Sequence, residues 1–122
     1  MTNALAWFEI PVADLERAAR FYGEILETPL EPGSSGEGYR MAVLPYEAGV
    51  GVGGALVEGS GHAPSAAGTL VYLSADLDAV LGRLERAGGK VLLGKTEIGT
   101  GSGFCAHFED SEGNRVGLYS ST

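Results

Sequence analysis

The fold is decided by the stretch Ala6-Trp7-Phe8-Glu9-Ile10-Pro11-Val12-Ala13-Asp14-Leu15, which returns 62 residues later as Gly68-Thr69-Leu70-Val71-Tyr72-Leu73-Ser74-Ala75-Asp76-Leu77. Each copy is a strand-like run that ends in Ala-Asp-Leu and leads directly into a helix pattern. A repeat present in only two copies is typical of a duplicated half-domain rather than of a long repeat array. We therefore expect the same order of elements twice, with a site between the two halves.

The first half predicts a strand, a helix and three further strands. Residues 5–12 alternate in polarity, which predicts a strand whose two faces differ. Asp14 is the expected N-cap of a helix over 15–27, which ends near Thr28 because the residue before a proline disfavours the helical backbone. Further strands are predicted over 30–34, 39–45 and 50–57.

The second half predicts the same pattern. A strand over 69–74 leads into a helix that is capped by Asp76 and ended by Gly88, and strands over 90–94, 104–109 and 115–120 follow. Residues 58–67 form a linker by composition, in which His62 is expected to be solvated. We predict a single domain over 1–122, with module one at about 4–57 and module two at about 68–120.

Composition and charge limit the function. The chain has 122 residues and a net charge of −8, which argues against binding to nucleic acid or to anionic membranes. No apolar stretch approaches the roughly 20 residues that span a bilayer. Cys105 is the only cysteine, so an internal disulfide is impossible and a reducing, cytoplasmic location is expected.

Two motifs carry a resemblance to a known family. Glu9-Ile10-Pro11-Val12-Ala13-Asp14-Leu15-Glu16-Arg17-Ala18 with Phe21-Tyr22, and Phe108-Glu109-Asp110-Ser111-Glu112-Gly113-Asn114-Arg115-Val116, resemble signatures of the vicinal oxygen chelate superfamily and its glyoxalase-like branch. The superfamily includes glyoxalase I, extradiol dioxygenases and bleomycin-resistance proteins. The resemblance implies an α+β fold of two βαβββ modules, in which a cup-shaped curled mixed sheet holds the ligand and the helices lie outside. It also implies a homodimer.

The resemblance implies four metal ligands, on the first and last strands of each module. Carried over to this chain, the four positions are Trp7, Thr69, Gly117 and, by the repeat, Ala55. None of these side chains is an imidazole or a carboxylate, so we expect no metal and no cofactor. A relocated metal site built from Glu9, Cys105, His107 and Glu109 remains the alternative.

The residues expected to line the cup and bind a small molecule are Trp7, Glu9, Met41, Val71, His107, Arg115 and Tyr119. Glu9 is expected either to face the ligand or to pair with Arg115, since a carboxylate in such a cup needs a partner. The leading hypothesis is a module that binds or sequesters a small organic molecule without a metal. The alternatives are a lyase or isomerase that uses Glu9 and His107 as acid and base, or a lyase or dioxygenase with a relocated metal.

Overall fold

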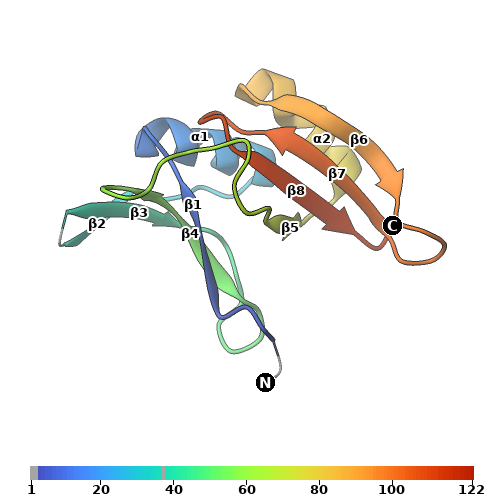
Figure 1. Ribbon diagram of the computed structural model, residues 1–122, viewed down its shortest axis with the longest axis horizontal. Coiled ribbons are helices and arrows are strands. Elements are labelled where there is room, and N and C mark those ends of the chain that lie inside the picture. Colours follow the sequence, from blue (N-terminus) through green and yellow to red (C-terminus); the bar gives the residue numbers. More distant parts are fainter. Residues whose placement is uncertain (1–2, 37) are drawn as a thin grey trace.

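The computed structural model describes residues 3–36 and 38–122, and in them the order strand, helix and three strands occurs twice (Figure 1). Module one contains β1 (Trp7–Pro11), α1 (Leu15–Leu26), β2 (Gly33–Gly36), β3 (Tyr39–Val43) and β4 (Gly53–Glu58). Module two contains β5 (Tyr72–Ser74), α2 (Leu77–Ala87), β6 (Lys90–Glu97), β7 (Phe104–Glu109) and β8 (Arg115–Ser120). The predicted α+β fold of two βαβββ modules is confirmed.

Each module forms one four-stranded mixed sheet. Sheet A has the order β1-β4-β3-β2 and sheet B the order β5-β8-β7-β6. The first strand runs parallel to the last strand of its module, and all the other pairings are antiparallel. The two sheets do not join into a barrel, so β1 and β5 are edge strands.

The helix boundaries follow from their caps. Asp14 and Asp76 have extended backbones, and their carboxylates accept from the N–H groups of Arg17 and Ala79, as the sequence predicted. Helix α2 ends at Gly88, which has a left-handed backbone. Helix α1 ends in the same way at Glu27, which has a left-handed backbone with φ of 52°. This cap ends the helix one residue before Thr28, the residue that precedes the proline.

The predicted strands differ from the observed ones mainly at their ends. The strand predicted over 69–74 is regular only from Tyr72, although the carbonyl of Val71 still accepts from the N–H of Gly117. Strand β6 continues to Glu97, three residues beyond its prediction, because its hairpin with β7 accommodates two register shifts. Strand β2 begins three residues later than predicted, at Gly33, where it pairs with β3.

Both helices pack on the same hydrophobic core, which lies between the two sheets. Helix α1 contacts β3, β4 and α2, and α2 contacts β6, β7, β8 and α1. The largest buried side chains include Phe21 and Tyr22 of α1 and Phe108 of β7. The centroids of their three rings lie 5.0 to 6.2 Å apart. The Tyr22 hydroxyl donates to the Asp110 carboxylate at 2.7 Å, which satisfies both buried groups.

The helices cover one face of each sheet, and no described helix or strand packs on the other face. We call these uncovered surfaces the open faces. The open face of sheet A carries Trp7, Glu9, Met41, Val43 and Ala55, and that of sheet B carries Tyr72, Cys105, His107, Arg115, Gly117 and Tyr119. Large apolar or aromatic side chains on both faces are exposed, among them Trp7 at 40% and Tyr72 at 47%.

Candidate functional site

Trp7 lies against the backbone of the strand beside it on the open face of sheet A. It is paired in register with Gly53, and a Cβ atom added at Gly53 would lie only 2.9 Å from the indole ring. The glycine therefore lets the indole lie close to the sheet. A flat, partly exposed ring of this kind is a suitable stacking surface for a planar ligand.

Glu9 takes its partners from its own module. One carboxylate oxygen lies 2.9 Å from Nε2 of His62, and the other accepts from the Trp7 indole N–H at 3.3 Å. The expectation that His62 is solvated is wrong, because its side chain is only 23% exposed and also packs edge-on against Tyr39. The alternative in which Glu9 pairs with Arg115 is wrong as well. The linker thus folds back onto the open face of sheet A.

A second polar cluster crosses the open face of sheet B. Tyr72 and His107 both pair in register with Gly117, so the three residues form a row across β5, β8 and β7. The Tyr72 ring covers Gly117, where an added Cβ would lie 2.5 Å from the ring, and the Tyr72 hydroxyl reaches Nε2 of His107 at 2.7 Å. Any larger residue at position 117 would displace this tyrosine.

Arg115 fixes the protonation of His107. Its Nε and Nη2 atoms lie 3.0 and 2.9 Å from Nδ1 of His107. A guanidinium group only donates, so Nδ1 must be the unprotonated acceptor and Nε2 must carry the proton. Burial, and then the positive charge of Arg115, lower the pKa of His107 below its ordinary value, which agrees with a neutral ring.

The other predicted ligand-binding residues lie around these two clusters. Met41 lies on β3 in sheet A, and Val71 immediately precedes β5. Tyr119, on β8, donates its hydroxyl hydrogen to the carbonyl of Ser102 at 2.9 Å. Cys105 is a half-buried free thiol that pairs in register with Tyr119.

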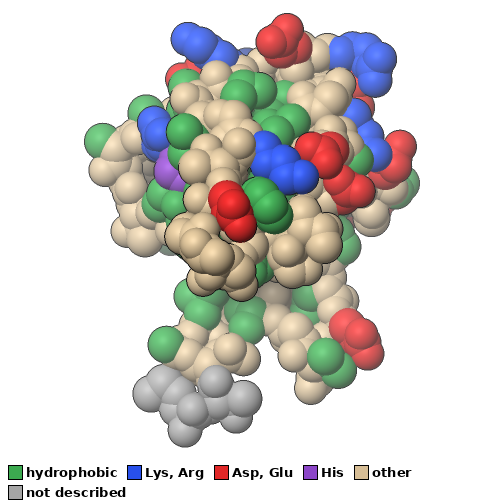
Figure 2. Space-filling view, turned by 90° about the vertical axis from the view of Figure 1, so that its right-hand side faces the viewer, with side chains coloured by type: hydrophobic (Ala, Val, Ile, Leu, Met, Phe, Trp, Pro, Cys, Tyr) green, Lys and Arg blue, Asp and Glu red, His purple; other side chains and the backbone are tan. Residues whose placement is uncertain are grey.

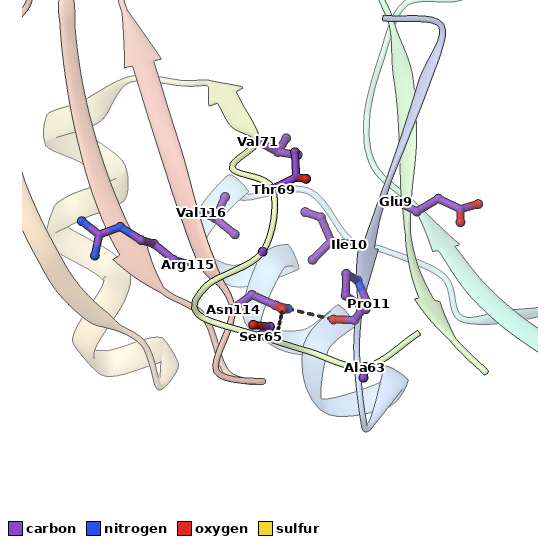
Figure 3. Close-up of a pocket in the computed structure, with 11 residues that line it drawn as sticks. Glu9, Ile10, Pro11, Ala63, Ser65, Thr69, Val71, Asn114, Arg115 and Val116 are labelled. Atoms are coloured by element: carbon purple, nitrogen blue, oxygen red, sulfur yellow. Dashed lines mark hydrogen bonds between the residues drawn. The ribbon is translucent and has the colours of Figure 1, made fainter. Parts of the chain in front are cut away.

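The two clusters do not meet within one chain. Figure 3 shows Ile10 and Val116 pointing into the space between the sheets. Glu9 and Arg115 also contribute to the lining of that space, but their charged ends point to opposite sides, away from it. The open faces therefore point apart. Glu9 and His107, the expected acid and base, lie on different faces and share no hydrogen bond.

A small cavity of about 170 Å³ lies at the seam between the modules (Figure 3). Its lining includes Ile10 and Val116 and, from the chain before β5, Thr69 and Val71. Asn114 closes it by donating to the carbonyl of Pro11 at 2.8 Å and accepting from the N–H of Ser65 at 3.0 Å. Sequence reasoning missed Asn114 as a connector, since contacts over such separations leave no local pattern.

The surface carries mixed charges. In the view of Figure 2, Lys and Arg side chains are interspersed with Asp and Glu side chains, and no continuous patch of positive charge is present on that face. Six of the eight basic residues are arginines, and four of these make ion pairs with glutamates in the described structure. Neither helix has the length and apolar character needed to cross a membrane within the described residues.

The model of one protein family matches nearly the whole chain. The model is that of the Glyoxalase/Bleomycin resistance protein/Dioxygenase superfamily, and it matches residues 4–118. The chain belongs to this superfamily. A comparison with curated proteins found no match.

Solved structures of other glyoxalase-superfamily proteins share the fold. A glyoxalase/bleomycin resistance protein from Streptomyces sp. CB03234 is 28% identical with a TM-score of 0.71, over 96% of this chain and 100% of that chain. The fosfomycin resistance protein FosX from Listeria monocytogenes is 16% identical with a TM-score of 0.66, over 100% and 94% of the two chains. A glyoxalase I mutant from Zea mays is 22% identical with a TM-score of 0.69, over 95% and 46%.

The metal site that the glyoxalase superfamily implies does not fit these residues. Gly117 lies under the ring of Tyr72, Trp7 presents an indole, and Ala55 and Thr69 offer no imidazole or carboxylate. In residues 3–36 and 38–122, His, Cys, Asp and Glu side chains nowhere gather in a group of three that could hold an ion. The Glu9, Cys105, His107 and Glu109 set is divided between the two sheets, and we derive no chemistry through a metal.

Proposed function

We propose that this protein is a homodimer that binds a small organic molecule without the superfamily's metal, in a cup formed by the open face of sheet A of one copy and the open face of sheet B of the other. The observation that carries the proposal is the opposite orientation of the two open faces within one chain (Figure 3). A cup that uses both faces therefore needs a second copy.

The edge strands support the same arrangement. Strands β1 and β5 each form an edge of their sheet and do not pack on each other within the described chain. Exposed edges are normally covered, and a two-fold axis between β1 of one copy and β5 of the other would cover both edges at once. It would also enclose the exposed rings of Trp7 and Tyr72. Large exposed apolar patches usually mark interaction sites, so this burial supports the arrangement.

The contents of the proposed cup favour binding of a planar or partly apolar molecule. Trp7 offers a stacking surface. Glu9 and Arg115 would bring opposite charges to the two walls of the cup. Met41, Val71, His107 and Tyr119 complete the proposed lining. A cytoplasmic location, inferred from the single cysteine, completes this proposal.

The second candidate is an enzyme of the lyase or isomerase type. His107 is held neutral with Nδ1 occupied by Arg115, and in the proposed dimer it would lie across the cup from the partner's Glu9. On opposite walls, the Glu9 carboxylate would act as the base, and the neutral His107 ring, which holds its proton on Nε2, would act as a hydrogen-bond donor. If turnover is found, loss of activity in both Glu9→Gln and His107→Asn would favour the enzyme, and unchanged activity would exclude this pair.

Complementation between two variants tests the shared cup. A thermal-shift screen first identifies a ligand, because binding to the folded state raises the melting temperature. Trp7→Ala and Tyr72→Ala each damage one wall, so neither homodimer should bind this ligand. After random exchange, half of the dimers are mixed and hold one intact cup each, so about a quarter of all cups should bind.

Failure of complementation would contradict the shared cup, as would a solution mass of 12.6 kDa by light scattering at micromolar concentration. Co-purification on two different affinity tags shows that the subunits exchange. With exchange demonstrated, absence of restored binding would mean that each chain forms its own site.

A further inference from the structure

Arg115 has no carboxylate partner among the residues that the structure describes. The ion pairs in the described part of the chain use Arg17, Arg40, Arg83, Arg86 and Lys95, and none uses Arg115. Glu109 lies directly opposite Arg115 in the β7–β8 pairing but does not form an ion pair with it. Instead, Nε and Nη2 donate to the neutral His107 ring. A guanidinium group has five N–H donors, so several remain free on this open face.

The hydrogen bonds of the cluster run in one direction. Arg115 donates to Nδ1 of His107, so Nε2 carries the proton and must donate to the Tyr72 hydroxyl oxygen at 2.7 Å. The hydroxyl hydrogen of Tyr72 then has no acceptor among the described residues. Because Tyr72 is about half exposed, this hydrogen is available to a ligand. The cluster therefore presents O–H and N–H donors to a ligand.

Gly117 makes this geometry possible. Tyr72 reaches His107 by crossing the strand between them, and the crossing needs a residue without a side chain at position 117. The two rings then meet edge-on, with centroids 5.4 Å apart. This contact holds the tyrosine ring in place, so the donor direction is fixed before a ligand arrives.

We propose that the Tyr72 hydroxyl and the free N–H groups of Arg115 bind the carboxylate of an organic monocarboxylate, with His107 as the positioning residue between them. The inference rests on the proposed function, because the second wall of the cup comes from the partner copy. One guanidinium supplies one positive charge, which matches a carboxylate. The chain's net charge of −8 disfavours an anion with several charges. The exposed rings around the cluster suit an apolar body on the same ligand.

The test compares benzoate with benzamide, its neutral isostere, by NMR titration of the wild-type protein. Benzoate should bind about tenfold more tightly than benzamide, since hydrogen bonds to a charged group are the stronger ones. Tyr72→Phe keeps the ring and removes the donor, so it should weaken benzoate binding about tenfold and leave benzamide unchanged. Thr28→Val is the control: it removes one hydroxyl just after α1, away from both open faces, and should leave both affinities unchanged.

Three outcomes separate this inference from the proposed function. If both probes bind equally, or if Tyr72→Phe has no effect, the carboxylate site is wrong while the cup stands. If neither probe binds to a dimer that binds a neutral ligand from the screen, the carboxylate site is again wrong. If the protein is monomeric and benzoate binding still depends on Tyr72, the shared cup is wrong and the carboxylate site stands.

The direction of the hydrogen bonds has a test that needs no ligand. Imidazole ¹⁵N spectra at pH 7.5 should show His107 protonated at Nε2 and not at Nδ1. Arg115→Met should mix the two tautomers, whereas Arg20→Met, which lies in α1 and outside this cluster, should not. A ring protonated at Nδ1 in the wild-type protein would overturn the proposed positioning of Tyr72.

Discussion

Nε of Arg17 and Oε2 of Glu112 lie 2.7 Å apart, although 95 residues separate them in the sequence. The same carboxylate accepts from the backbone N–H groups of Ala13 and Asp14, both at 2.9 Å, at the start of α1. The turn between β7 and β8 therefore holds the beginning of the first helix. The Glu112 side chain is 0% exposed, so this contact joins the modules through a shielded charge.

Removing the charge of Glu112 should destabilise the protein. Glu112→Gln keeps one acceptor but loses the ion pair, and we expect a loss of about 1–3 kcal/mol in the free energy of unfolding, measured in urea. Glu24→Gln is the control. Its ion pair with Arg86 is exposed and 3.9 Å long, so the loss should be below about 0.5 kcal/mol. Equal losses in the two variants would mean that the Glu112 ion pair contributes no more to stability than an exposed ion pair does.

The same residue predicts acid sensitivity. Burial alone would raise the pKa of Glu112, but donation from Arg17, Asp14, Ser111 and Ala13 outweighs burial and lowers its pKa from 4.5 to about 2. As the pH falls from 4.5 toward 2, the unfolded state binds the proton first. The stability that Glu112 contributes above pH 4.5 is therefore lost in this window.

Urea unfolding between pH 6 and pH 3 checks the acid sensitivity, with Glu112→Gln for comparison. The variant should lose less stability than the wild type as the pH falls, because it has no carboxylate to protonate at this position. Parallel pH profiles of the two proteins would contradict the assignment of this acid sensitivity to Glu112.

The two N-caps should contribute equally and independently. Asp14 and Asp76 each accept one N–H of the first helical turn, at 3.0 and 3.1 Å. Replacing either by alanine should cost about 1 kcal/mol, and the double variant should show the sum, since the caps belong to different helices. Thermal unfolding of the three variants gives the three values. A loss near zero for both single variants would contradict the capping roles.

Two glycines should respond in opposite ways to alanine. Gly117→Ala places a Cβ 2.5 Å from the Tyr72 ring, so it should displace the ring, break its bond to His107 and cost about 1 kcal/mol. Gly82 lies inside α2 with open space around it, so Gly82→Ala should stabilise by roughly 0.5–1 kcal/mol. Chemical denaturation measures both, and a neutral Gly117→Ala variant with an unchanged His107 ¹⁵N spectrum would contradict the row across sheet B.

Divalent metals should not stabilise this protein. The positions that the superfamily uses hold Trp7, Ala55, Thr69 and Gly117, which offer no suitable ligand set. Nickel, zinc, manganese or iron should leave the melting temperature unchanged, because no folded-state site shifts the equilibrium. One equivalent of metal that survives dialysis, and is lost in Glu9→Ala or His107→Ala, would favour a relocated site.

The sequence by itself determined the local structure. Alternation in residues 5–12 predicted a strand with two different faces, and the Ala-Asp-Leu repeat predicted both helix starts, because these signals act within a few residues. The glycine turn after α2 and the order of elements in each module were readable for the same reason. The prediction of His62 failed, because its contact with Glu9 joins groups 53 residues apart.

Only the tertiary structure decided how these elements combine. Packing α1 against α2 turned the open faces of the two sheets apart, and so separated Glu9 from His107. The Tyr72–His107 bond also depends on strand order, since β8 must lie between β5 and β7 with a glycine at the crossing. Strand pairing and helix packing bring together residues far apart in the chain, and their geometry is set by the sum of many contacts rather than by any short motif.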